Sequence, residues 1–260
     1  MTFADLAPVT LIAAGALMVV VWAASVALRD ASIVDVVWGL GFAMISIVGW
    51  VRADGVPARR TLVTILTVVW GARLAVHLLV RNWGAGEDNR YRAMRRRWGD
   101  RFPVVSLFTV FCLQGVLMWI VSLPVQAAQA ATTPDALTWV DGLGVVLWMT
   151  GFGFEVIGDG QLRRFKADPA NAKAVMDQGL WRYTRHPNYF GDATLWWGIG
   201  VIALSARGWW ALAGPMVMTL LLLRVSGVPL LERRMKRTRP GYEDYVGRTS
   251  AFVPLPPKNA

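Results

Sequence analysis

The chain has 260 residues, of which 55% are hydrophobic and only 17% are charged, so its composition excludes an ordinary soluble domain and indicates a protein solvated by lipid. Its formal net charge is +10, but the basic residues lie between long apolar runs, so we expect no nucleic-acid partner. One cysteine, Cys112, excludes an intrachain disulfide, and His77 and His186 have no carboxylate at ligand spacing, so we expect no metal site.

Seven apolar runs are candidates for helices that cross a bilayer, which requires about 20 residues. The runs cover 6–28, 33–51, 61–80, 104–123, 139–157, 190–206 and 208–231. The run 190–206 is the shortest, and the first run has no basic segment before it, so we expect it to be retained as a helix. The sequence predicts an all-α polytopic membrane protein with seven transmembrane helices. No repeat or linker divides the chain, so we expect a single domain over residues 1–260.

The basic residues predict the orientation of these helices. If the N-terminus is outside, the inner segments are 29–32, 81–103, 158–189 and 232–260, and they hold 21 of the 27 Lys and Arg residues. The positive-inside rule therefore places the N-terminus outside and the C-terminus in the cytoplasm. The outer segments hold Arg52, Arg59, Arg60 and Arg207. Three of these four arginines lie in 52–60, which violates the rule locally.

Asp35 is an acidic residue near the start of the second run, one helical turn before Trp38. An ionisable residue in hydrocarbon costs roughly 2.5–3.5 kcal/mol on insertion scales, so its presence suggests a function. Ser32 precedes Asp35 by three residues, which is the spacing of a capping box, so Asp35 could instead only cap the helix. Other ionisable residues within or at the ends of spans are Arg73, His77, Glu155, Asp159, Asp192 and Arg224.

Several polar or small residues within spans have a purely structural explanation. Trp70, Arg73 and His77 share one helical face and could form a stack without chemistry, which is the favoured interpretation. Gln114 would by default make a hydrogen bond between helices and otherwise contact a ligand. The glycines at 151, 153, 158 and 160 could admit a cofactor, but close helix packing explains them equally well.

The densest polar stretch, residues 179–192, lies immediately before the sixth run. Pro187 fits the first turn of that helix, and Arg182, Arg185 and His186 lie beside the helix start, where a phosphate is stabilised. An interfacial anchor of aromatic and basic residues explains the same composition equally well. The run of arginines at 95–97 is better explained as a solvated positive-inside feature than as part of a phosphate site.

Three motifs occur together in this chain. They are Ser32-x-x-Asp35-x-x-Trp38-Gly39, Asp88-x-Arg90-Tyr91 and Arg185-His186-Pro187-Asn188-Tyr189-x-Gly191-Asp192. In this order they resemble the bacterial membrane branch of the steroid 5-alpha-reductase family, and the resemblance spans nearly the whole chain. The third motif alone also resembles isoprenylcysteine carboxyl methyltransferases and is less specific.

The resemblance implies a seven-helix enzyme of the cell inner membrane, monomeric among membrane lipids, with a cavity open to the cytoplasm that holds NADPH. Its reaction would reduce the carbon–carbon double bond of a hydrophobic enone, such as a 3-oxo-4-ene steroid, to the 5-alpha-reduced product. The cofactor-binding residues that the resemblance implies are Asp159, Lys166, Asn188, Tyr189, Asp192 and Arg224. We expect Arg90, Arg182, Arg185 and His186 to join them as basic groups that bind the phosphates. Glu155 stands where eukaryotic members have an asparagine that contacts the cofactor.

The resemblance also implies catalytic residues. Asp35 best matches the family's catalytic glutamate, although it is one methylene shorter. The family's catalytic tyrosine falls near Trp70 by spacing, and Tyr91 is the nearest tyrosine. We therefore expect Asp35 and Tyr91 to be catalytic, with Trp38 and Gln114 binding the substrate. Reduction of an enone needs a donor aimed at the carbonyl oxygen, and a buried carboxylic acid that stays protonated can supply it.

Two other functions account for part of the sequence. A methyltransferase that uses S-adenosylmethionine is supported by the Arg-His-Pro motif and by the tail from Leu231-Glu232-Arg233 to Tyr242-Glu243-Asp244-Tyr245. That methyl donor has no phosphate, so it does not explain the many inner arginines. A non-enzymatic lipid-binding protein would use the arginines as anchors for anionic lipid, but it gives Asp35 no role beyond the cap.

Overall fold

The structure is a computed structural model that describes residues 1–225 and 227–258. Within these residues all regular elements are helices, and the strand-like pairing is confined to an isolated bridge between Thr184 and Ser250. The prediction of an all-α fold is therefore confirmed. The chain forms two compact units, a first unit of Met1–Asp141 and Ile202–Gly214 and a second unit of Gly142–Val201 and Pro215–Ala260. The single functional domain stays a prediction.

Among the described residues, six helices are long and apolar enough to cross a membrane, as expected of a polytopic membrane protein. They are Phe3–Leu28, Ile33–Arg52, Pro57–Asn82, Asn89–Val121, Trp139–Ala167 and Trp209–Thr238. The predicted span 190–206 does form a helix, α9 (Pro187–Ser205), which begins at Pro187 as expected. It is not among the six, because Asn188 and Asp192 in its first turns lower its mean hydropathy. A seventh span stays a prediction.

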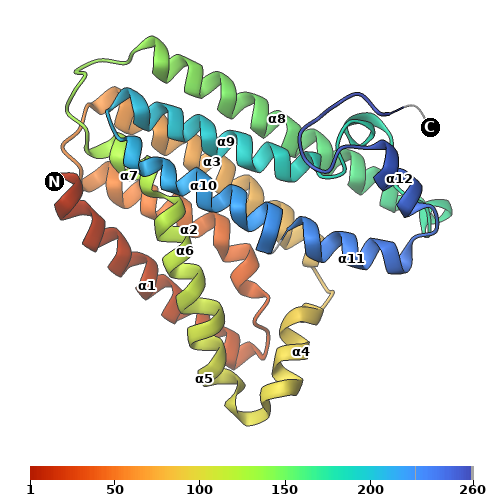
Figure 1. Cartoon of the computed structure of the whole chain (residues 1–260). Coiled ribbons are helices and arrows are strands. Elements are labelled where there is room, and N and C mark those ends of the chain that lie inside the picture. The colour runs from red at the N-terminus through yellow and green to blue at the C-terminus, as the bar shows by residue number, and fades with distance from the viewer. Residues whose placement is uncertain (226, 259–260) are drawn as a thin grey trace. The chain divides into compact units, whose positions relative to one another are not determined.

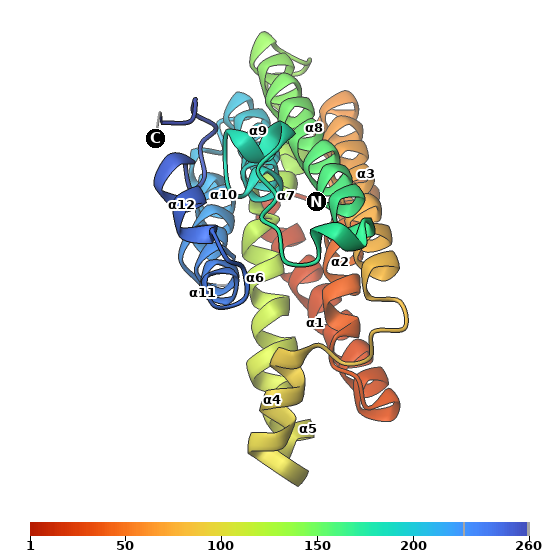
Figure 2. The same ribbon diagram turned by 90° about the vertical axis from the view of Figure 1, so that its right-hand side faces the viewer.

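The first unit is built around helix α2, which packs against both α1 and α3. Helices α4 and α5 meet through a short 3-10 turn, Gly99–Arg101, at one end of this unit (Figures 1 and 2). The helix that begins at α5 continues through a π-helical segment, Leu107–Cys112, into α6. The helices of the first unit are α1 (Phe3–Leu28), α2 (Ile33–Arg52), α3 (Pro57–Asn82), α4 (Asn89–Trp98), α5 (Phe102–Ser106), α6 (Leu113–Val121) and α7 (Leu123–Ala130).

Two glycines let the backbones of α2 and α3 approach closely. A Cβ atom added to Gly39 would lie 2.4 Å from the carbonyl oxygen of Gly71, and one added to Gly71 would lie 2.3 Å from that of Gly39. Real Cβ atoms essentially never lie so close to another atom, so any residue other than glycine at position 39 or 71 would force the two helices apart. The position of α2 in the first unit therefore depends on this crossing.

Gly39→Ala is expected to destabilise the protein by about 1–3 kcal/mol, the usual cost of forcing extra atoms into a packed interior. The matched control is Gly15→Ala in α1, where an added Cβ meets no atom within 4 Å. That change should be neutral or stabilise by up to about 1 kcal/mol, because alanine favours helix over glycine. Unfolding in mixed micelles compares the two variants. Equal effects would contradict the close crossing.

A buried ion pair explains the predicted violation of the positive-inside rule. Arg59 is fully buried, and its Nε lies 3.0 Å from Asp141 Oδ1. Its Nη atoms donate to the carbonyl oxygens of Pro134 and Ala136. Arg60 also donates to a carbonyl oxygen, that of Ala53. Because the Asp141 carboxylate neutralises Arg59 and two carbonyl oxygens accept from its Nη atoms, this arginine does not act as a free positive charge.

The second unit contains helices α8 and α9, whose backbones are also close. A Cβ atom on Gly151 would lie 2.5 Å from the Gly191 carbonyl oxygen, and one on Gly158 would lie 3.2 Å from the Pro187 ring. Close packing therefore explains these two glycines, whereas Gly153 and Gly160 have no such neighbour within 4 Å. The remaining helices of this unit are α10, α11 and α12. The bounds are α8 (Trp139–Ala167), α10 (Ala213–Leu220), α11 (Val228–Thr238) and α12 (Tyr242–Arg248).

Candidate functional site

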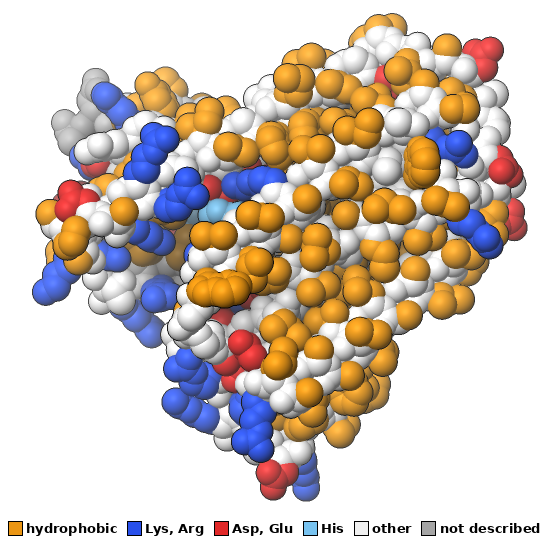
Figure 3. All heavy atoms as spheres, turned by 180° about the vertical axis from the view of Figure 1, so that it is seen from behind, with side chains coloured by type: hydrophobic (Ala, Val, Ile, Leu, Met, Phe, Trp, Pro, Cys, Tyr) orange, Lys and Arg blue, Asp and Glu red, His pale blue; other side chains and the backbone are white. Residues whose placement is uncertain are grey.

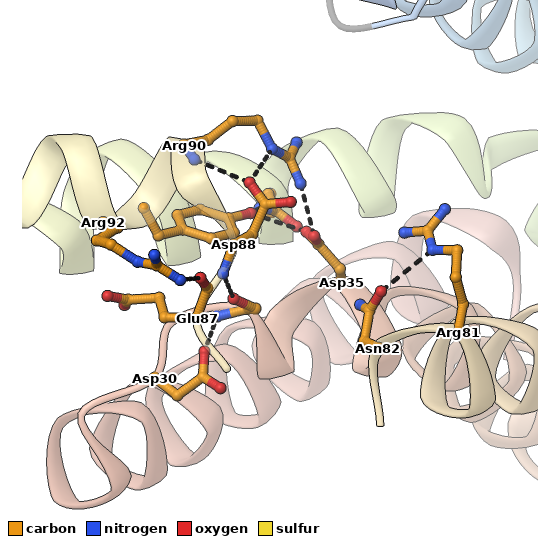
Figure 4. Close-up of polar contacts among 11 residues, drawn as sticks. Asp30, Asp35, Arg81, Asn82, Glu87, Asp88, Arg90 and Arg92 are labelled. Atoms are coloured by element: carbon orange, nitrogen blue, oxygen red, sulfur yellow. Dashed lines mark hydrogen bonds and ion pairs between the residues drawn. The ribbon is translucent and has the colours of Figure 1, made fainter. Parts of the chain in front are cut away.

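A cluster of polar side chains surrounds Asp35 in the first turn of α2 (Figure 4). The Tyr91 hydroxyl donates to Asp35 Oδ1 at 2.8 Å, and Arg90 Nη2 lies 2.7 Å from Asp35 Oδ2. Tyr91 is buried, while the Asp35 side chain is 17% exposed and that of Arg90 is 52% exposed. Both carboxylate oxygens therefore bind residues that follow Asp35 by about 55 positions in the sequence. The Asp35 side chain remains partly exposed at the surface. We call Asp35, Arg90, Tyr91 and Gln114 the Asp35 cluster.

The capping-box explanation of Asp35 is wrong, because the Ser32 side chain makes no capping hydrogen bond to α2. The Ser32 hydroxyl instead accepts a 2.6 Å hydrogen bond from the backbone N–H of Asp88. Asp88 in turn caps α4 by accepting from the Arg90 N–H, and its carboxylate also binds the Arg90 side chain at 3.0 Å. Ser32 thus fixes the start of α4 against the start of α2.

Gln114 joins the cluster from α6. Its Nε2 lies 3.5 Å from the Tyr91 hydroxyl, so the hydrogen bond between helices, expected by default, is present. Gln114 is the second residue after the π-helical segment Leu107–Cys112. Such segments change the register of the helix after them and are frequent at functional sites. The π-helical segment therefore helps to set the side of α6 from which Gln114 extends.

Glu87 clamps the segment before α4 to the turn between α1 and α2. Its carboxylate accepts from Arg95 at 3.1 and 2.7 Å and from the Ala31 backbone N–H at 3.0 Å. Partial burial by itself raises the pKa of Glu87, but the hydrogen bonds from Arg95 and Ala31 outweigh it and hold the pKa below its usual value. The clamp therefore favours a charged carboxylate that keeps α4, and with it Tyr91, beside Asp35.

A row of three aromatic rings leads from α2 to α3 next to the Asp35 cluster. Trp38 meets Phe42 edge to face with ring centroids 5.3 Å apart, and Phe42 meets Trp70 in the same way at 5.3 Å. Phe42 and Trp70 are fully buried, whereas Trp38 is partly exposed. Trp38 is therefore the member of the row that can touch a ligand, as its predicted role in substrate binding requires.

In the second unit an acidic residue, Glu232, contacts two of the residues predicted to bind a phosphate, and the sequence did not predict this contact. Glu232 of α11 lies 2.8 Å from Arg185 Nε and 3.2 Å from His186 Nε2, and both partners are buried. The Arg185 guanidinium also donates to the carbonyl oxygens of Val246 and Thr249. In this arrangement Arg185 binds the C-terminal tail, so its predicted phosphate contact would need these bonds to open.

The other predicted cofactor residues of the second unit fall into two groups. The Asn188 side-chain amide donates to Asp159 Oδ1 at 3.1 Å, and the ring of Tyr189 stacks on His186 with centroids 5.4 Å apart. Asp159 is buried in α8, and Asp192 lies one turn after Asn188 in α9. Lys166, Arg182 and Arg224 have exposed side chains. The structure thus brings the motif residues of α8 and α9 together and leaves these three cations at the surface.

The C-terminal tail closes over the 179–186 segment. The hydroxyl of Tyr245 donates to the carbonyl oxygen of Trp181, and Thr184 donates to that of Phe252 at 2.8 Å. Burial, reinforced by the nearby charge of Glu232, raises the pKa of Tyr242 to about 12. The tail residues noted for the methyltransferase alternative therefore form part of the packing around the Arg-His-Pro motif.

A family model described as "Protein of unknown function (DUF1295)" matches residues 21–249. An uncharacterized protein of Schizosaccharomyces pombe is 24% identical to the chain over 204 residues, which cover 68% of the chain. The aligned region spans 58% of the length of that relative. No solved structure matches the chain.

Proposed function

The chain belongs to the DUF1295 family, and from this premise and the geometry of the Asp35 cluster we propose that it is a membrane-embedded reductase. Its substrate would be a hydrophobic enone, most simply a 3-oxo-4-ene steroid, and its reductant NADPH. The observation that carries the proposal is the hydrogen bond between the Tyr91 hydroxyl and the Asp35 carboxylate.

This hydrogen bond suits the electrophilic half of an enone reduction. A hydride added to the β carbon breaks the double bond and moves an electron pair to the carbonyl oxygen, and a proton then completes the saturated ketone at the α carbon. The developing oxyanion needs a hydrogen-bond donor held in place before reaction. In the proposal Tyr91 or a protonated Asp35 donates to that oxygen, Gln114 orients Tyr91, and Trp38 contacts the apolar body of the substrate.

NADPH, when bound, would supply the hydride and its two electrons. The side chains of the second unit fit such a dinucleotide in chemical type. Arg182 and Lys166 are exposed cations of the kind that bind phosphates, and the Asn188–Asp159 pair offers polar groups suited to ribose hydroxyls or an amide. The proposal assigns Arg185 and His186 to holding this region together rather than to direct phosphate contact.

We also propose that the N-terminus is outside and the C-terminus in the cytoplasm of an inner-membrane protein with α9 as a seventh span. The burial and neutralisation of Arg59 support this orientation, because they remove one of the four outer basic residues from the tally. The long basic segments would then face the cytoplasm, where NADPH is available.

NADPH is expected to bind the detergent-purified protein. Arg182→Ala should weaken binding about tenfold or more, the loss of one hydrogen bond to a charged phosphate, and Asn188→Ala about threefold to tenfold, the loss of one hydrogen bond between neutral groups. Calorimetry measures the affinity of each variant for NADPH and for S-adenosylmethionine. Arg207→Gln is the control, because Arg207 is an exposed arginine on the proposed outer side. Binding of S-adenosylmethionine without any dinucleotide would replace the reductase with the methyltransferase.

A further inference from the structure

The first unit contains a pocket that is distinct from the Asp35 cluster, between the end of α1 and the α4–α5 connection. Its volume is about 590 Å³. Pockets that bind small ligands typically enclose about 300–1,000 Å³. We call it the α1–α5 pocket, and its lining consists of Ser25, Val26, Arg29, Arg95, Gly99, Asp100, Phe102 and Pro103.

The pocket lies beside two of the helices that are long and apolar enough to cross a membrane, Phe3–Leu28 and Asn89–Val121. Helix α1 ends at Leu28 and α5 begins at Phe102, so the lining combines the last turn of one with the first turn of the other. The Trp22 indole donates to the Pro103 carbonyl oxygen at 2.9 Å and fixes the two helices to each other. Tryptophans and charged residues at helix ends mark the headgroup level of a bilayer. Figure 3 shows acidic and basic side chains together at this end, beside the apolar surface of the long helices.

The charged groups of the pocket have open hydrogen-bonding capacity. The exposed Arg29 side chain has no hydrogen-bond or ion-pair partner within residues 1–225 and 227–258. Arg95 gives Nε and Nη2 to Glu87 and lies over the Phe102 ring at 4.3 Å, which leaves Nη1 for a ligand. The exposed carboxylate of Asp100 likewise makes no side-chain contact in the described part of the chain.

The balance of these charges selects the class of ligand. Glu87 neutralises Arg95, and Asp100 offsets Arg29, so the pocket is close to neutral while it presents both cationic donors and an anionic acceptor. A purely anionic ligand would be attracted by Arg29 and Arg95 and repelled by the Asp100 carboxylate. A zwitterion can satisfy both.

We propose that the α1–α5 pocket binds the headgroup of a zwitterionic phospholipid with a primary amine. The phosphate takes Arg29 and the open Nη1 of Arg95, for which guanidinium is well suited. The ammonium donates to Asp100. The acyl chains lie on the apolar surface just above the pocket, where Val26 is 39% exposed and Val104 is 61% exposed.

Native mass spectrometry of the detergent-purified full chain tests this site with three probes of matched acyl chains: phosphatidylethanolamine, phosphatidylcholine and phosphatidylglycerol. We expect one retained phosphatidylethanolamine and weaker retention of the other two. Arg29→Gln should weaken its binding about tenfold or more, and Asp100→Asn should abolish the preference for the primary amine. Arg96→Gln, an exposed arginine next to Arg95 that does not line the pocket, should change neither result.

Equal retention of all three lipids, unaffected by the variants, would mean nonspecific boundary lipid and overturn the proposal. A preference for phosphatidylglycerol in the unaltered protein would overturn the amine assignment. Soluble phosphoethanolamine that binds as well as the whole lipid would identify a free phosphate ester as the ligand. If Arg29→Gln does not fold, the change of headgroup preference in Asp100→Asn still decides the question.

Discussion

Asp35→Asn is expected to lower turnover by roughly 100-fold or more, the usual cost of removing one electrophilic donor, while NADPH affinity stays nearly unchanged. Asparagine keeps the shape of the side chain and an oxygen that can accept from Tyr91, which donates to Asp35 at 2.8 Å. It cannot carry a transferable proton or a negative charge. The expected loss therefore reflects chemistry at the carboxylate and not a collapse of the cluster.

The measurement is NADPH oxidation with a 3-oxo-4-ene steroid, alongside NADPH affinity for the same variant. Asp88→Asn is the matched control, because Asp88 also pairs with Arg90 but makes no hydrogen bond to Tyr91 within the described residues. Tyr91→Phe should cause a loss comparable to that of Asp35→Asn if the two residues act as one donor. Normal turnover in Asp35→Asn would remove Asp35 from the mechanism and direct attention to Tyr91 and the face of Trp70, Arg73 and His77.

Glu232→Ala is expected to destabilise the protein by about 3 kcal/mol, the lower end of the cost of breaking a buried ion pair, because the Glu232 side chain itself is 17% exposed. Glu232 contacts Arg185 at 2.8 Å and His186 at 3.2 Å, and the side chains of these two residues are 9% and 1% exposed. Without the carboxylate, the Arg185 guanidinium stays buried and keeps the carbonyl oxygens of Val246 and Thr249, which carry no full negative charge. The cost of desolvating its charge is then no longer offset.

The matched control for this prediction is Asp177→Asn, which breaks the ion pair between Asp177 and Arg248. Those side chains are 38% and 44% exposed, so the loss should stay below about 1 kcal/mol. Unfolding by detergent titration in mixed micelles gives both values. A Glu232→Ala cost no larger than that of Asp177→Asn would show that Glu232 does not hold the Arg-His-Pro segment to the tail.

Local properties of the sequence predicted much of the fold. The apolar run 33–51 corresponds to α2 at Ile33–Arg52, and Pro187 begins α9, because hydropathy and backbone restriction act on neighbouring residues. Boundaries were less accurate where helices continue past the apolar run. Helix α8 ends at Ala167 rather than near 157, since its last turns are polar but still helical. The π-helical segment Leu107–Cys112 had no signal in the sequence.

The candidate site could be predicted only in part. Asp35 stood out because an acid near membrane depth is costly, and the motif resemblance added Tyr91, but no spacing rule gives the 2.8 Å bond between residues 56 positions apart. Ser32 looked like a cap because its spacing to Asp35 fits one, and the competing N–H of Asp88 was invisible in the local sequence. Glu232 could have been linked to Arg185 only by charge complementarity, which many residue pairs share.

The Arg59–Asp141 pair imposes an order on biosynthesis. The two residues are 82 positions apart, and ribosomes add about 5–20 residues per second, so Arg59 is synthesised roughly 4–16 seconds before its counter-ion. During that interval the guanidinium must remain hydrated at the membrane surface or be shielded by other protein. We therefore expect α3 to reach its final packing only after the start of α8, which carries Asp141, has been synthesised.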